Sequence, residues 1–261
     1  MSLPDAKQAW PPFDMDRLER YRTSEQEKAR TTDLMRILPR GRRSVLDVGA
    51  RDGHFSRLLT EYFAEVTALD LSKPHFEIPG VTTLAGNVTN LAFAADSFDC
   101  VFCAEVLEHV ADVEKACREI ARVAKHEVII GAPFKQDIRI GRSVCHVCGE
   151  INPPWGHVNS FDEKGLLVLF SGLQIISKSF VGRTKEATNA VSTFLLDLAG
   201  NPWGTYDQDE PCIKCGAKLK APGSRAIWQK GCSNIASRMN RIQAMFTKPH
   251  AVWIHLVFSK I

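Results

Sequence analysis

The sequence predicts an α/β fold built around a doubly wound, mostly parallel sheet, in a single domain spanning residues 1–261. Two observations lead to this prediction. From Ser44 onward, short apolar runs rich in β-branched residues alternate with amphipathic segments. Such alternation is typical of parallel strands covered by helices on both faces. With 261 residues and 44% hydrophobic composition, the chain can bury one large core but not two large independent ones.

The predicted elements follow one another in a regular order. Residues 14–40 carry apolar side chains at helical spacing and end at Pro39-Arg40-Gly41, which predicts an N-terminal helical cap. Seven apolar or β-branched runs are expected to be strands, at residues 44–49, 65–70, 81–86, 98–106, 127–133, 173–182 and 250–258. Four amphipathic segments are expected to be helices, at residues 54–63, 113–124, 162–172 and 233–246. The stretch 183–232 is expected to be rich in loops.

Basic residues gather in the C-terminal part of the chain. The net charge is only +3, yet no acidic residue follows Glu210, whereas nine Lys and Arg residues do. This tail is therefore expected either to face an anionic partner or to pack against an acidic body.

The composition also bears on the compartment. No run approaches the roughly 18 uninterrupted apolar residues of a membrane span, and acids and prolines stand where a signal peptide needs an apolar core. Four of the eight cysteines form two Cys-x-x-Cys pairs, a pattern that favours metal binding over disulfides. We therefore expect a cytoplasmic protein.

A ligand site is expected where the first predicted strand meets the following helix. Gly49 permits close approach of a ligand to the backbone, Gly53 eases entry into the helix, and Asp70 ends the second strand, where its carboxylate can accept both hydroxyls of a ribose. A dinucleotide site needs Gly-x-Gly-x-x-Gly, but residues 50–52 are Ala-Arg-Asp, and Asp52 would repel a pyrophosphate. A cofactor that has a ribose and no phosphates, such as S-adenosylmethionine, fits this turn better.

The segments "VLDVGARDGHFSRLL", "VTALDLS" and "AGNVTNLAFAADSFDCVFCAEVLEHV" resemble the class I S-adenosylmethionine-dependent methyltransferases, in particular the type 11 small-molecule group typified by quinone-biosynthesis methyltransferases. The resemblance covers roughly residues 44–133. It implies a Rossmann-like, seven-stranded sheet whose last strand is antiparallel, with S-adenosylmethionine as cofactor. The residues that it places at the cofactor are Asp47, Gly49, Ala50, Gly53, Asp70, Leu71, Asn87, Val88, Ala104 and Glu105.

The resemblance also implies roles for these residues. Asp70 would hold the ribose, the pair 87–88 would contact the adenine, and the pair 104–105 would line the methionine end. Two positions depart from the family pattern, because Arg51 replaces the middle glycine of the turn and Asn87 replaces the usual acid. The Asn87 side-chain carbonyl can still accept a hydrogen bond from the adenine amino group.

Two zinc knuckles are predicted outside this region, in insertions at residues 135–156 and 199–232. "CHVCG" and "CIKCG" each place a glycine directly after the second cysteine, where it permits the tight turn of a knuckle. Together they supply the four thiolates of a tetrahedral site, at Cys145, Cys148, Cys212 and Cys215. Four thiolates leave no open coordination position, so the metal is expected to be structural. Free thiols, or two unrelated turns, are the alternative.

The motif "NPPW" at residues 152–155 is what amino-methyltransferases place at the end of the fourth strand. Here "AEVLEHV" follows that strand, and "NPPW" comes after the fifth strand instead, so we interpret it as a rigid turn. His157 lies in a His-x-x-x-Phe segment that, in methyltransferases similar to this chain, borders the acceptor pocket. His157 is therefore a candidate catalytic base and His109 a second one. Either histidine alternatively serves only as a hydrogen-bonding or capping residue.

The resulting hypothesis is methyl transfer from S-adenosylmethionine to a small-molecule acceptor, most plausibly a hydroxyl oxygen of a sugar, a lipid-linked compound or a natural product. Two alternatives stay open. One is an RNA methyltransferase that grips phosphates with the basic, zinc-bearing tail. The other is a methyltransferase-like interaction module that binds no cofactor, which the altered glycine turn favours.

Overall fold

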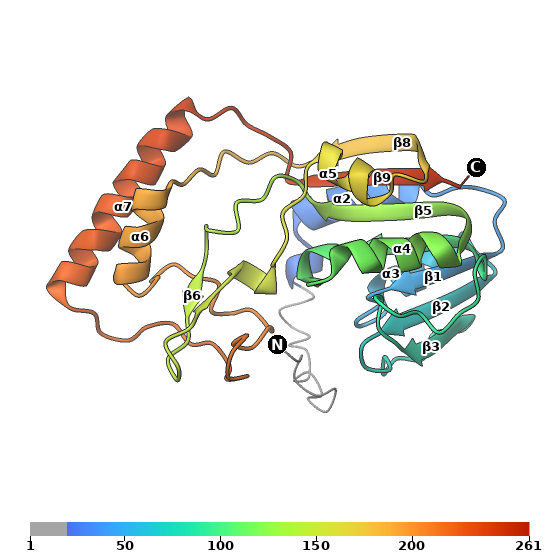
Figure 1. The fold of residues 1–261 in the computed structure, drawn as a ribbon, viewed down its shortest axis with the longest axis horizontal. Coiled ribbons are helices and arrows are strands. Elements are labelled where there is room, and N and C mark those ends of the chain that lie inside the picture. The colour runs from blue at the N-terminus through green and yellow to red at the C-terminus, as the bar shows by residue number, and fades with distance from the viewer. Residues whose placement is uncertain (1–19, 261) are drawn as a thin grey trace. The chain divides into compact units, whose positions relative to one another are not determined.

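The computed structural model describes residues 20–260, which divide into two compact units (Figure 1). Unit 1 comprises the described residues up to Pro133 together with Asp162–Gly182 and the C-terminal strand from Trp253. Unit 2 comprises Phe134–Phe161 and Arg183–Val252. Both predicted insertions, 135–156 and 199–232, lie in unit 2, which also includes residues 157–161 and 183–198.

Unit 1 contains a seven-stranded sheet in the order β3-β2-β1-β4-β5-β9-β8. The strands pair in parallel from β3 to β5, whereas β9 is antiparallel to both of its neighbours. The predicted mostly parallel sheet with an antiparallel last strand is thus confirmed. The strands are β1 (Ser44–Val48), β2 (Glu65–Asp70), β3 (Val81–Ala85), β4 (Phe98–Ala104), β5 (Ala124–Pro133), β8 (Gln174–Val181) and β9 (Trp253–Ser259).

Helices cover the sheet because each has one apolar face. From α2 (Glu25–Arg36) and α3 (His54–Leu59), the side chains of Leu34 and Leu59 are fully buried against residues of β1, β4 and β5. On α4 (Val113–Val123), Ala116, Ile120 and Val123 are fully buried at helical spacing. The shorter helix α5 (Glu163–Leu169) lies beside α4 (Figure 1).

The N-terminal helical cap is observed in part. Helix α2 lies inside the predicted range, with Ser24 as its N-cap accepting a hydrogen bond from the Glu27 N–H at 3.2 Å. Residues 14–19 of the predicted cap lie outside the described residues. Within residues 20–260, no helix is both long enough and apolar enough to cross a membrane.

Unit 2 is built from a small hairpin and two helices. Strands β6 (Ser143–Val144) and β7 (Ile151–Asn152) pair antiparallel, and helices α6 (Ala190–Leu198) and α7 (Ile227–Phe246) lie side by side (Figure 1). The expectation of loops throughout 183–232 was wrong for α6 and for the first turns of α7. Asn189 caps α6 through a reciprocal capping box with Ser192. Val191, Phe194 and Leu198 of α6 are exposed and its large apolar residues are nowhere fully buried, so the usual buried apolar stripe does not mark this helix.

Candidate functional site

The carboxyl ends of the parallel strands in unit 1 converge at one edge of the sheet, where open α/β sheets bind ligands. Asp70 ends β2 there. Its Oδ2 accepts a hydrogen bond from the Arg51 N–H at 2.9 Å and its Oδ1 accepts one from the Leu71 N–H at 2.7 Å. These two bonds hold the carboxylate in a fixed orientation, and each oxygen keeps capacity for a further donor. The geometry fits a carboxylate that receives two vicinal hydroxyls.

The glycines of the turn after β1 are needed for packing as well as for backbone conformation. Gly49 has φ 77°, and a Cβ built on it would lie 2.2 Å from Val106 Cγ2. Gly53 has φ 82°, and a Cβ there would lie 2.8 Å from the ring of Phe76. Arg51, which replaces the expected middle glycine, also adopts a positive φ of 48°. The turn therefore keeps its left-handed conformation without that glycine.

The side-chain oxygen of Asn87, which was expected to bind the adenine, already has hydrogen-bond donors within the protein. Its Oδ1 already accepts hydrogen bonds from both the N–H and the hydroxyl of Thr89, each at 2.9 Å. Those two bonds use the two lone pairs of the amide oxygen, so an adenine amino group would have to displace one of them. Val88, the second predicted adenine contact, is buried, as are Ala50 and Ala104.

A buried charge network lies at the carboxyl end of β4. Arg30 on α2 is 4% exposed and donates from Nε to Glu27 Oε2 at 2.7 Å. Its Nη1 lies 3.6 Å from Glu105 Oε1, while Glu105 Oε2 accepts from Trp253 Nε1 at 3.3 Å. Arg30 Nη1 and Glu105 Oε1 are both buried and make no hydrogen bond to any described residue. Burial raises the pKa of Glu105, although Arg30 counteracts the rise.

Asp47, near the end of β1, is a buried carboxyl group. It is 2% exposed and accepts a hydrogen bond from the Ser56 hydroxyl at 2.5 Å. Burial raises the pKa of Asp47 to about 7, and the bond from Ser56 offsets only part of that rise. Asp47 is thus partly protonated near neutral pH.

The four predicted metal-ligating cysteines meet in unit 2. The Sγ atoms of Cys145, Cys148, Cys212 and Cys215 all lie within 4.8 Å of one another. The Cys145–Cys215 and Cys148–Cys212 sulfur pairs are each 3.6 Å apart. Four thiolates about 2.3 Å from a tetrahedral zinc would be separated by about 3.8 Å. The four-cysteine cluster therefore has the ligand type, number and spacing of a structural zinc site.

The two Cys-x-x-Cys loops also share one backbone conformation. In the first, the N–H of Gly149 donates to the carbonyl of Cys145; in the second, the N–H of Gly216 donates to the carbonyl of Cys212. Both bonds are 2.9 Å long, and both glycines have positive φ, as predicted for knuckle turns. Hairpin β6–β7 presents the first loop.

Asn152 of the "NPPW" motif belongs to this cysteine-bearing unit. It is 1% exposed, its Nδ2 donates to the Glu150 carbonyl and its Oδ1 accepts from the Ile213 N–H, each at 2.9 Å. Both polar atoms of the side chain are thus engaged between the two cysteine loops.

The two candidate bases lie in different units. His157 in unit 2 is buried, and its Nδ1 lies 2.6 Å from Gln136 Oε1. Since an amide oxygen only accepts, this contact favours the tautomer with Nδ1 protonated and the basic lone pair on Nε2. His109 in unit 1 is exposed at the end of the short helix η1 (Leu107–His109).

Arg30 was not predictable as a site residue from the sequence. This residue stands in a strongly charged segment, where a solvated position is the ordinary expectation. Nothing in the local pattern distinguishes it from Lys28 or Arg36, which are exposed. Its burial follows from the packing of α2 against the sheet beside Phe55 and Trp253, whose rings lie 5.3 Å and 5.8 Å from the guanidinium carbon.

Residues of unit 1 are similar in sequence to known proteins. Residues 46–130 match the methyltransferase domain family. The chain is 35% identical over 98 residues to the uncharacterized methyltransferase YcgJ of Bacillus subtilis, covering 34% of this chain and 39% of that protein. It is 36% identical over 93 residues to the ubiquinone biosynthesis O-methyltransferase of Nitrosospira multiformis, covering 32% of this chain and 39% of that protein. The matched region thus spans less than half of either relative.

Solved structures share the fold over most of the chain. The B. subtilis YcgJ structure covers 89% of this chain and 97% of its own, with a TM-score of 0.51 and 20% identity. A chain of the Haloferax volcanii complex that contains the Trm112 methyltransferase activator covers 94% and 95%, with a TM-score of 0.53 and 13% identity. Residues 46–130 are thus similar to a methyltransferase domain, and the sheet order and the solved structures show that the chain has the Rossmann-like fold of these proteins.

Proposed function

We propose that this protein transfers a methyl group from S-adenosylmethionine to a hydroxyl oxygen of a small-molecule acceptor, such as a sugar, a lipid-linked compound or a natural product. The observation that carries the proposal is the Asp70 carboxylate, held by the Arg51 and Leu71 N–H groups at the carboxyl edge of a methyltransferase domain. Its remaining acceptor capacity suits the two ribose hydroxyls of the cofactor.

The buried pair of Arg30 and Glu105 supports the same cofactor. The methionine end of S-adenosylmethionine carries a carboxylate and an ammonium group. Arg30 Nη1 and Glu105 Oε1 are one cationic and one anionic atom, both buried and without a hydrogen bond to any described residue. Because unsatisfied buried polar atoms are costly, a ligand with complementary charges would stabilise both. Arg30 would hold the carboxylate, and Glu105 would accept from the ammonium.

When bound, S-adenosylmethionine supplies an electrophilic methyl group on a sulfonium. The chain's own contribution is to hold the acceptor in line with that methyl, to exclude water and to accept the hydroxyl proton. His157 is the first candidate for the proton acceptor, since Gln136 favours the tautomer whose Nε2 is basic. His109 is the second. The oxygen acceptor is supported by the relative named as an O-methyltransferase.

The proposal includes a structural zinc ion held by the four-cysteine cluster. Its support is the convergence of four thiols at tetrahedral spacing in two matching loops. Such an ion would have no open coordination position, so its role would be to fix the two loops of unit 2.

The test begins with titration calorimetry against S-adenosylhomocysteine, with NADH as the comparison ligand. We expect binding of the first and none of the second. The methyl-transfer step is then measured with radiolabelled S-adenosylmethionine and paired acceptors that differ only in a free or a blocked hydroxyl. Binding without transfer to any free hydroxyl would refute the oxygen acceptor, and absence of binding would support the module that uses no cofactor. Label transferred to RNA instead would support the RNA methyltransferase.

A further inference from the structure

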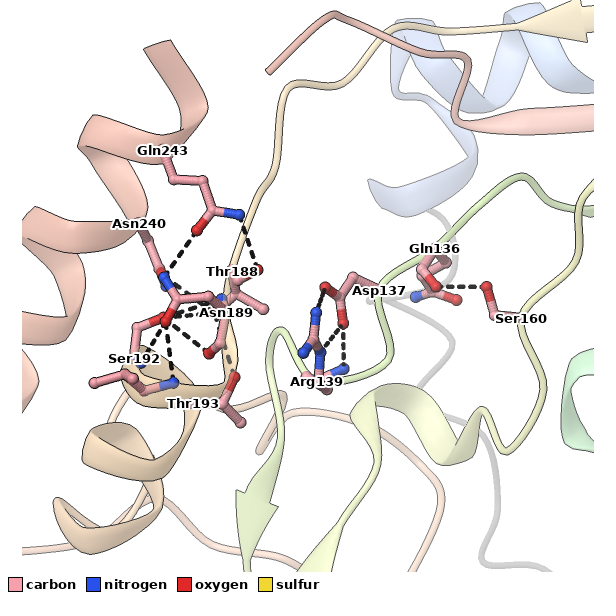
Figure 2. Close-up of polar contacts among 11 residues, drawn as sticks. Gln136, Asp137, Arg139, Ser160, Thr188, Asn189, Ser192, Thr193, Asn240 and Gln243 are labelled. Carbon is pink, nitrogen blue, oxygen red and sulfur yellow. Dashed lines mark hydrogen bonds and ion pairs between the residues drawn. The ribbon is translucent and has the colours of Figure 1, made fainter. Parts of the chain in front are cut away.

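Helices α6 and α7 of unit 2 contact each other through polar residues, whereas large apolar residues on both helices are exposed. Their contact is made by polar groups: Asn189 Nδ2 donates to Gln243 Oε1 at 2.9 Å, and Gln243 Nε2 donates to the Thr188 carbonyl at 3.0 Å. Thr188 Oγ1 also donates to Asn240 Oδ1 at 3.1 Å. Figure 2 shows these side chains gathered between the two helices. The buried residues of the two helices are polar or small: Ser192, Thr193, Ser233 and Ala236.

The outer face of α7 is apolar. Trp228, Ile235 and Ile242 recur at intervals of seven residues, which places them on one face of the helix, and each is more than half exposed. Phe246 extends the same face and is 83% exposed. By contrast, Ser233 and Ala236 on the opposite face are buried. Large apolar residues that face outward along a whole helix mark an interaction surface.

The charge of α7 indicates what covers that face. Its charged residues are Lys230, Arg238 and Arg241, all exposed, and it contains no acid. Arg238 lies at the edge of the apolar face beside Ile235 and Ile242, and Arg241 and Lys230 lie farther around the helix on the same side. A second copy of the same helix would bring like charges together. An anionic lipid surface complements both the apolar side chains and the basic ones.

We propose that the outer face of α7 is a docking surface for anionic membranes, with the helix lying in the plane of the lipid headgroups. Trp228, Ile235, Ile242 and Phe246 insert at the boundary between headgroups and acyl chains, while Lys230, Arg238 and Arg241 contact lipid phosphates. The polar contact with α6 explains how α7 stays attached to unit 2 while its apolar face is turned outward. The exposed Val191 and Phe194 of α6 show the same outward arrangement.

RNA is disfavoured as the partner because two of the four large apolar side chains on the face, Ile235 and Ile242, are isoleucines. Recognition of single-stranded RNA uses aromatic platforms together with basic residues, and isoleucines provide no such platform. The surface does not depend on the proposed methyl transfer, and its test needs neither cofactor nor acceptor.

The test is co-sedimentation of the full chain with vesicles of equal parts phosphatidylglycerol and phosphatidylcholine, compared with vesicles of phosphatidylcholine alone. We expect binding to the anionic vesicles that weakens as salt is raised. The Ile235→Asp/Ile242→Asp variant should lower the partition coefficient at least tenfold. The Lys230→Gln/Arg238→Gln/Arg241→Gln variant should lower it by about fivefold for each charge that contacts lipid, and should reduce the salt dependence.

The matched control is Val168→Asp, which places the same charge at an apolar residue that is 73% exposed on α5 in unit 1. It should bind as the unaltered chain does. Circular dichroism verifies the fold of each variant, and the charge-neutralised variant keeps the test decisive if the double aspartate variant does not fold. The proposal is refuted if the unaltered chain ignores anionic vesicles, if it forms a dimer that Ile235→Asp/Ile242→Asp disrupts without binding vesicles, or if it binds RNA in preference to them.

Discussion

The side-chain oxygen of Asn152 accepts a hydrogen bond from the backbone N–H of Ile213 at 2.9 Å. Asn152 follows the first Cys-x-x-Cys pair and Ile213 lies inside the second, so this bond joins the two loops independently of any metal. The asparagine of "NPPW" thus has a defined structural partner.

Replacing Asn152 should therefore destabilise unit 2. Asn152→Ala leaves the Ile213 N–H without its acceptor at a buried position, and we expect a loss of about 1–3 kcal/mol in the free energy of unfolding. Chemical denaturation followed by circular dichroism measures it. Asn234→Ala, at an exposed position on α7 of the same unit, serves as the comparison. Equal stability of the two variants would mean that the bond contributes nothing.

Purified protein should contain one zinc ion per chain, measured by inductively coupled plasma mass spectrometry. Cys212→Ser/Cys215→Ser should abolish it, because two thiolates cannot complete a tetrahedral site, while Cys232→Ser should retain it. Chelation should lower the thermal stability of the protein, since the binding free energy of the ion contributes to folding. Zinc retained in the double variant would show that the two loops do not share an ion.

Removal of the Asp70 carboxylate should weaken cofactor binding. We expect Asp70→Ala to reduce the affinity for S-adenosylhomocysteine by about 1.5–3 kcal/mol, the range for hydrogen bonds to a charged group. Titration calorimetry gives the affinity, and Glu61→Ala, at an exposed position on the same unit, should leave it unchanged. Unaltered affinity in Asp70→Ala would remove Asp70 from the ribose role.

Asp47 should make the stability of the cofactor-free protein depend on pH. Its folded-state pKa of about 7 lies above the ordinary value of 3.8. The folded state therefore holds the proton more tightly, and stability falls as pH rises from about 4 to about 7, by as much as about 4 kcal/mol. Asp47→Asn should remove this contribution, so the variant gains stability relative to the unaltered protein across that window. Denaturation at pH 5 and pH 8 measures the free energy of unfolding of both proteins. The same difference between the two proteins at both pH values would contradict the raised pKa of Asp47.

Replacing His157 should affect turnover and not cofactor binding. If its Nε2 takes the proton from the hydroxyl group that is methylated, His157→Ala should lower kcat by about 10²- to 10⁴-fold. The affinity for S-adenosylhomocysteine should stay the same. His146→Ala, an exposed histidine in the first cysteine loop, is the control. An unchanged kcat would leave His109 as the remaining candidate.

The sequence by itself determined the sheet and the positions of its site. Short β-branched runs bounded by turn residues produced the seven strands, since a parallel strand buried on both faces must be apolar along its length. The turn after β1 and the acid that ends β2 were likewise visible, because strand ends and glycines are local signals. The meeting of the four cysteines was predictable because two Cys-x-x-Cys pairs, each followed directly by a glycine, are typical of a four-thiolate metal site.

Only the tertiary structure decided which charged residues are buried and which apolar residues are exposed. Arg30 lies in a segment that looks solvated, and its contact with Glu105, 75 positions later in the chain, depends on how α2 packs. Asn87 looks available for adenine, but Thr89 occupies its oxygen. Helix α6 was missed, and the sequence of α7 did not show what its apolar face packs against, because a periodic pattern shows only that a helix has two faces. It does not show which of them packs on the protein, since that is determined by partners distant in the sequence.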